Sequence, residues 1–133
     1  MSKLLHLDIL TPYRKYLSKD VTFLRVYNDD AVLGILPGHA PIITTIKISE
    51  MMFKDERGEE YTFAVGGGLL SIKDNVATLM VNTIESEDEI DLPRAEAALA
   101  RAQQRLEEKL ENLDVKRAQL ALLRATVRIN VKK

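Results

Sequence analysis

The chain of 133 residues contains no cysteine, and its histidines are limited to positions 6 and 39. Without cysteine there is no disulfide framework and no thiolate chemistry. With so few nitrogen ligands and no sulfur ligands, a zinc site is not expected. His6 falls in an expected strand and His39 in a loop, and neither lies in a nucleophile motif. Hydrolytic catalysis is therefore not expected either.

An excess of one charge is also lacking, because 19 Lys and Arg residues face 20 Asp and Glu residues, for a net charge of −1. This balance argues against a general nucleic-acid binder, which usually carries a basic excess. No apolar run approaches the roughly 20 residues that span a bilayer, and residues 1–10 lack the pattern of a signal peptide. We expect any membrane association to run through another protein.

Glycine and proline are both missing after Pro93. Before this point short apolar runs are broken by glycine and charged turns, and after it Ala, Leu, Glu, Gln, Arg and Lys dominate. Such a change in composition is typical of a β domain followed by helices. We therefore predict an α+β chain, in which residues 1–86 form an antiparallel β-sandwich domain and residues 87–133 form a helical αα-hairpin.

The first half contains short runs that favour strands, at residues 5–10, 21–27, 31–36, 42–48, 51–54, 60–65, 69–72 and 76–81. Turn residues at 55–58 and 73–75 predict two hairpins. In the run 21–27, alternation places Val21 and Phe23 on one face and Leu24 and Val26 on the other. Strands of this length and spacing are typical of an antiparallel sandwich or barrel. The glycines at 66–68 lack the Lys-Ser or Lys-Thr of a phosphate-binding loop and predict a bend.

In the second half, Asp91 and Asp114 each precede a periodic segment and are predicted to cap a helix. Pro93 fits the first turn, where a missing N–H costs little. At helical spacing one apolar stripe comprises Ala95, Ala98, Leu99, Ala102, Leu106 and Leu110, and a second comprises Val115, Ala118, Leu122, Ala125 and Ile129. With a turn at 111–114, two antiparallel helices pack through these stripes.

The second helix carries a further apolar face, formed by Leu120, Leu123 and Val127. A helix with two apolar faces must bury both. One face is expected to pack on the first helix. The other requires either the chain's own β domain or a partner protein, and the sequence leaves both open.

Arginines follow the edges of both stripes, at positions 94, 101 and 105 and at 117, 124 and 128. Folding of the hairpin would bring the two basic edges together. Forked guanidinium groups suit phosphate or carboxylate oxygens. The alternative is ordinary salt bridging to Glu96, Glu107, Glu108 and Glu111.

Three motifs give the chain a family resemblance. They are the start at residues 6–12 (HLDILTP), the loop at 34–41 (GILPGHAP) and the segment 64–68 (AVGGG). Together with the order of a β half and a helical hairpin, they resemble the epsilon subunit of bacterial F-type ATP synthases over essentially the whole length.

The resemblance implies a non-catalytic subunit of the rotating central stalk, which couples proton flow to ATP synthesis. It implies a sandwich bound to the gamma subunit and the c-subunit ring, at the cytoplasmic face of the bacterial membrane without insertion. It also implies a hairpin that folds down or extends toward the catalytic alpha and beta subunits to inhibit hydrolysis. Partner contacts are then expected at Pro37, Gly38, His39, Leu120, Leu123, Val127, Lys132 and Lys133.

Residues 90–95 (IDLPRA) match a motif with which some bacterial members bind ATP. The resemblance places Glu85, Ile90, Asp91 and Ala95 near the base and sugar. It places Arg94, Arg101, Arg124 and Arg128 at the phosphates. ATP would be a regulatory ligand, and no cofactor is required. The main alternative is a free-standing ATP-sensing or anion-binding adaptor, and a small metal-dependent enzyme ranks behind both.

Overall fold

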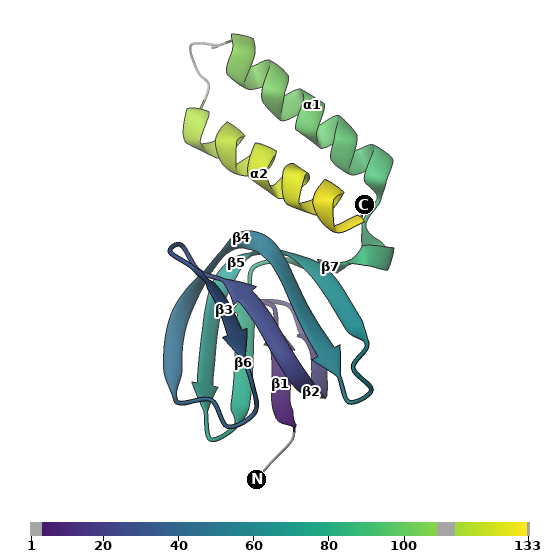
Figure 1. Ribbon diagram of the computed structural model, residues 1–133. Helices are drawn as coiled ribbons and strands as arrows, with labels where there is room; N and C mark the ends of the chain where they lie inside the picture. Colours follow the sequence, from purple (N-terminus) through teal and green to yellow (C-terminus); the bar gives the residue numbers. More distant parts are fainter. Residues whose placement is uncertain (1–3, 109–113, 133) are drawn as a thin grey trace.

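A computed structural model of the protein describes residues 4–108 and 114–132. It shows a β domain with a hairpin of two helices standing on one end (Figure 1). The predicted fold class is thereby confirmed. The elements are β1 (Leu5–Leu10), β2 (Lys15–Tyr27), β3 (Val32–Ile35), β4 (Ile42–Asp55), β5 (Glu60–Lys73), β6 (Val76–Val81), β7 (Ile84–Ser86), the 3-10 helix η1 (Glu87–Glu89), α1 (Leu92–Glu108) and α2 (Val115–Lys132).

The strands form one continuous ladder in the order β1-β6-β5-β4-β2-β3, and β1 also pairs with β2. This extra pairing closes the ladder on itself, so that apolar side chains fill its interior. The pairs are antiparallel except for β1 with β6, which run parallel. Among the described strands, β3 and the short β7 lie outside the ring. The first pairs with β2 and the second with β5.

Alternation along β1 buries Leu5, Leu7 and Ile9 completely. In β2 the predicted alternation is wrong, because Val21, Leu24 and Val26 are all fully buried. The pairing with β4 shifts register between Val21 and Phe23. Such a bulge adds one residue to the strand and reverses the faces that follow it.

β4 and β5 are each 14 residues long, where the sequence predicted two shorter strands in each place. The glycine segment lies inside β5 and provides the predicted bend. Gly67 has a φ of +91°, a conformation that side-chain-bearing residues rarely adopt. The backbone after β6 passes close to this bend, since the Gly66 N–H donates to the carbonyl of Thr83 at 2.9 Å. One bent strand can thus pair with β6 at one end and β7 at the other.

Both helices begin where predicted. Asp91 Oδ1 accepts from the Arg94 N–H at 3.2 Å, and Asp114 Oδ1 accepts from the Arg117 N–H at 3.0 Å. The buried stripe residues are Ala95, Ala102, Ala118, Ala125 and Ile129. Small alanines let the helices approach closely. Val115 was wrongly placed in the stripe, because it is 51% exposed in the first turn of α2. Leu110, residues 111–113 and Lys133 lie outside the described residues.

The second apolar face of α2 is partly covered by the β domain, since α2 lies between α1 and the strands (Figure 1). Val127 packs on a buried cluster of Val131, Ala64 and Ile90. Leu123, nearer the tip of the hairpin, is 42% exposed. The chain's own sandwich therefore covers the C-terminal part of this face and leaves the remainder accessible.

The loop with the predicted partner residues Pro37, Gly38 and His39 joins β3 to β4, at the end of the β domain opposite the hairpin (Figure 1). The Gly38 N–H donates to Asn75 Oδ1 at 2.8 Å, and Asn75 Nδ2 donates to the Leu4 carbonyl at 2.7 Å. One asparagine in the β5–β6 turn therefore joins this loop to the start of β1.

Replacing Asn75 with glycine should lower the free energy of unfolding by about 1–2 kcal/mol, because hydrogen bonds of the side chain are lost. Its φ of +62° suits glycine, so the turn itself is preserved. Asn75→Asp is the matched control, since a carboxylate oxygen still accepts from Gly38. Urea unfolding measures the loss of stability, and hydrogen exchange at the Gly38 amide measures the loss of its hydrogen bond to Asn75. A Gly38 amide that exchanges equally slowly in Asn75→Gly would contradict this role.

Candidate functional site

A cavity of about 390 Å³ lies where the hairpin meets the sandwich. This volume is in the range of small-molecule sites. The cavity brings together residues from β7, η1 and both helices. Its lining residues are Glu85, Glu89, Asp91, Arg94, Ala95, Ala98, Arg101 and Arg128.

The two helices supply the cations of this cavity. Arg94 and Arg101 are seven residues apart on α1, which places them on the same face of the helix. Arg128 enters from α2, and its Nε donates to Glu85 Oε1 at 2.5 Å, with both side chains about two-thirds buried (32% and 31% exposed). This charge-assisted contact also ties α2 to the last strand of the sandwich.

Each acidic residue of the cavity already has a partner. Glu85 pairs with Arg128, Glu89 accepts from the Tyr16 hydroxyl, and Asp91 caps α1. Across residues 4–108 and 114–132, the guanidinium groups of Arg94 and Arg101 have no carboxylate within 4.0 Å. The alternative of salt bridges with helix glutamates is thus not seen for them in that part of the chain. Two cations therefore line the cavity without a counter-ion among the described residues, and Arg94 lies in the first turn of α1, at the positive end of the helix. This arrangement suits an anion.

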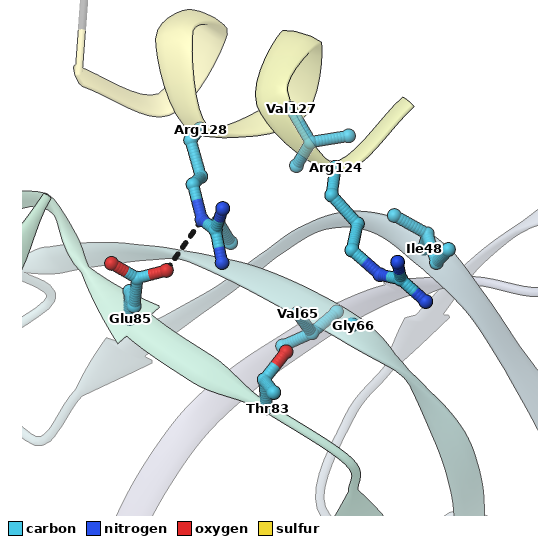
Figure 2. A pocket seen from close by; sticks show the side chains of 9 residues that line it. Ile48, Val65, Gly66, Thr83, Glu85, Arg124, Val127 and Arg128 are labelled. Carbon is cyan, nitrogen blue, oxygen red and sulfur yellow. Dashed lines mark hydrogen bonds and ion pairs between the residues drawn. The ribbon is translucent and has the colours of Figure 1, made fainter. Parts of the chain in front are cut away.

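The remaining predicted residues lie beside the cavity. Ile90 is buried beneath α2, with 4% of its surface exposed. Arg124 lines a neighbouring hollow of about 10 Å³, which has room for a water molecule at most. Figure 2 shows Arg128 directed at Glu85, while Arg124 extends on the side of Ile48. The two hollows share Glu85 and Arg128, so Arg124 is adjacent to the main cavity.

Sequence reasoning missed Glu89 as a cavity residue, along with its partner Tyr16. Tyr16 lies on β2, 73 residues away in the chain. No spacing in the sequence indicates this pair, because the contact depends on the closure of the sandwich. Ala98 was placed on the helix stripe, and it reaches the cavity from the edge of that stripe.

A second polar cluster lies on the exposed face of β1 and β2. His6 Nδ1 contacts Asp20 at 2.9 Å, and Nε2 contacts Asp8 at 3.1 Å. Ser18 Oγ lies 3.1 Å from Nε2 but donates to Asp8 at 2.6 Å. The order Ser18, His6, Asp20 has the contacts of a catalytic triad.

The direction of the Ser18 hydrogen bond argues against nucleophilic catalysis in this cluster. The hydrogen bond to Asp20 raises the pKa of His6, and Asp8 adds to the effect. The Ser18 hydroxyl lowers the pKa of Asp8. The Ser18 hydroxyl donates its proton to Asp8, so this proton is not directed at the imidazole of His6. The cluster instead ties β1 to β2. Within the described ranges, no group of three or more His, Cys, Asp or Glu could hold a metal ion.

Models of known families match the chain over its whole described length. Residues 4–87 match the β-sandwich domain of the ATP synthase delta/epsilon chain, and residues 88–133 match its long α-helix domain. An ATP synthase epsilon chain of Pelotomaculum thermopropionicum is 44% identical over 103 residues, which cover 77% of this chain and 76% of the relative. The epsilon chain of Geobacter metallireducens is 41% identical over 103 residues, covering 77% and 74%.

Two solved structures share the fold. A chain of the mitochondrial ATP synthase of Euglena gracilis, solved as OSCP, F1 and c-ring, aligns with a TM-score of 0.83 at 18% identity. The match covers 92% of this chain and 78% of that one. A central-stalk and c-ring structure of the Tetrahymena thermophila enzyme gives a TM-score of 0.62 at 17% identity, covering 98% and 94%. The sandwich with its hairpin is thus an arrangement that solved proteins adopt.

Proposed function

The chain belongs to the ATP synthase delta/epsilon chain family, and on that premise we propose that its hairpin is a nucleotide-sensing regulator of the complex. It is the epsilon subunit of an F-type ATP synthase and part of the central stalk. The chain is therefore a subunit of an enzyme complex. In our proposal it has no catalytic activity of its own.

The sandwich, in this proposal, binds the gamma subunit and the c-subunit ring. The loop at Pro37, Gly38 and His39 is a contact candidate because it lies at the end of the sandwich remote from the hairpin. No helix among the described residues is long and apolar enough to cross a membrane. As a subunit of this membrane-associated complex, the chain is proposed to lie peripherally, at the cytoplasmic face of the bacterial membrane.

The hairpin supplies the regulation. When docked, it buries Val131, packs the half-buried Val127 on the sandwich, and assembles the cavity. When released, it would free these residues and the exposed Leu123 for the gamma subunit and the catalytic alpha and beta subunits. Lys132, whose Nζ donates to the Glu87 carbonyl at 3.0 Å in the docked state, would then be available to an acidic partner. The released form is the one that inhibits ATP hydrolysis.

ATP favours the docked form in this account, because its cavity exists only there. Arg94, Arg101 and Arg128 face the phosphates, with Arg124 alongside, while Glu85, Asp91 and Ala95 lie near the base and sugar. The observation that carries the proposal is the pair of uncompensated guanidinium groups in a cavity of ligand size. A ligand that binds one state alone shifts the population toward that state.

Deleting the chain after Glu89 tests the regulatory role. The truncated protein should fold and still join gamma and the c-ring, because the interior core and loop lie upstream. ATP hydrolysis by the reconstituted complex should rise, because the inhibitory hairpin is absent. The full-length chain is the control, and by itself it should hydrolyse nothing. Failure of the truncated chain to bind gamma, or an unchanged rate of hydrolysis, would contradict the proposal.

A further inference from the structure

One side chain of the sandwich reaches across to the junction with the hairpin. The Tyr16 hydroxyl of β2 donates to Glu89 Oε1 in η1. The Tyr16 ring packs edge-on against Phe63 of the buried core, with ring centroids 6.2 Å apart. Because Phe63 is fixed by the core, Tyr16 offers Glu89 a partner held in one position.

Glu89 also organises the segment that leads into α1. Its Oε1 accepts from the Ser86 N–H at 3.0 Å, and its own N–H donates to Ser86 Oγ at 3.3 Å. These reciprocal bonds form a capping box around η1. The helix cap Asp91 follows two residues later, and Glu89 and Asp91 both line the cavity. Glu89 therefore closes the turn that leads directly into the cap of α1.

The protonation states of Tyr16 and Glu89 favour a stable hydrogen bond between them. Burial, with the adjacent Glu89 carboxylate, raises the pKa of Tyr16 to about 12. The same hydrogen bond lowers the pKa of Glu89. At neutral pH a neutral phenol therefore donates to a carboxylate, and such charge-assisted bonds are stronger than bonds between neutral groups.

We propose that Tyr16 and Glu89 are positioning residues for the nucleotide cavity. Their contact holds residues 86–91 against the sandwich, so that the first turn of α1 faces Arg128 and Glu85. The inference rests on the proposed nucleotide function, and it adds a residue of the β domain to the control of the hairpin. Tyr16 does not line the cavity, so it acts only through Glu89.

In its proposed role, the contact between Tyr16 and Glu89 links two measurable quantities. They are the docked fraction of the hairpin and the apparent dissociation constant for ATP. If the contact favours the docked hairpin, its loss raises the ratio of undocked to docked molecules. The apparent dissociation constant for ATP then rises by the factor through which the docked fraction falls. A contact that merely stabilised the sandwich would change the unfolding midpoint without linking these two quantities.

The experiment uses the full-length chain with two spin labels. The absence of native cysteine allows labelling at Lys73→Cys on the sandwich and Gln103→Cys on α1, which are both exposed. Distances between the labels report docking, and calorimetry reports ATP binding. Tyr16→Phe is compared with Tyr61→Phe. The latter also removes a hydroxyl bonded to carboxylates, those of Asp55 and Glu59, but at the β4–β5 turn.

We expect Tyr16→Phe to raise the undocked-to-docked ratio about tenfold, as the loss of a bond to a charged group would. The apparent ATP affinity should fall by the factor through which the docked fraction falls, and saturating ATP should restore the docked distance. Tyr61→Phe should leave both unchanged. Glu89→Gln keeps an oxygen acceptor for Tyr16 and Ser86, so its effect should be smaller than that of Glu89→Ala.

Distances in Tyr16→Phe that match those of Tyr61→Phe would overturn the proposal. If the unsubstituted chain bound no ATP, the nucleotide function would fail by itself. The distances measured without ATP would still decide the inference: separation of the labels in Tyr16→Phe supports the contact as a positioning device, and unchanged distances overturn it.

Discussion

Replacing Gly68 with alanine is expected to lower the free energy of unfolding by about 3 kcal/mol or more, a large share of the roughly 5–15 kcal/mol by which folded domains are stable. A Cβ at this position would lie 1.9 Å from the Met80 carbonyl oxygen and 2.8 Å from the Val81 Cα. Both are backbone atoms of β6, which pairs with β5 at this point. The clash can be relieved only by separating the two strands. Urea unfolding followed by circular dichroism measures the loss.

Gly34→Ala is the matched control. Its Cβ would meet only the Phe23 ring, at 3.2 Å, and that side chain can move. Its cost should stay within about 1 kcal/mol. A Gly68→Ala protein as stable as Gly34→Ala would show that β5 and β6 do not approach as closely as described here.

Replacing Arg128 with alanine should weaken ATP binding by roughly 30-fold, or about 2 kcal/mol, because charge-assisted bonds to phosphate are lost. The same change removes the ion pair with Glu85 that ties α2 to β7. Docking and binding should therefore fall together. Calorimetric titration measures the loss of ATP binding, and a distance measurement between α1 and the sandwich measures the loss of docking. Together they separate the missing phosphate contact from the missing docking contact.

Arg117→Ala is the control for Arg128→Ala. Arg117 is exposed on the same helix and does not line the cavity. Arg117→Ala removes the same charge as Arg128→Ala, so a nonspecific electrostatic effect would appear equally in both variants. Equal losses of ATP affinity would contradict the assignment of Arg128 to the phosphates.

Local signals in the sequence predicted the regular parts of this fold. Alternation identified β1, the turns at 55–58 and 73–75 identified two hairpins, and Asp91 and Asp114 identified the helix starts. In each case the determining interaction lies within a few residues, as helix caps and tight turns do. These features could be predicted without knowledge of the tertiary structure.

Longer-range features escaped the sequence for physical reasons. The bulge after Val21 depends on the pairing of β2 with β4, and it reverses the buried face at Leu24. The continuity of β4 and β5 follows from a bent ladder in which Gly67 opposes no single partner residue. Neither the bulge nor the strand continuity can be predicted from the local sequence, because register is set by the pairing of two strands.

The candidate site was predictable as a set of residue types but not as a geometry. Helical spacing placed Arg94 and Arg101 on the edge of one helix and Arg128 on the edge of the other, and the family resemblance added Glu85. The structure separates Arg124 into the neighbouring hollow and buries Ile90. The contact of Tyr16 with Glu89 required the closed sandwich, so no reading of either segment alone would have found it.

Calorimetric titration of the isolated full-length chain with ATP tests the central claim most directly, with ADP and Arg94→Ala as controls. Arg94 is the appropriate variant because its guanidinium lines the cavity and takes part in no ion pair within the described residues. The account predicts saturable ATP binding that Arg94→Ala loses. No binding by the unsubstituted chain, or equal binding by Arg94→Ala, would contradict the hairpin as a nucleotide sensor.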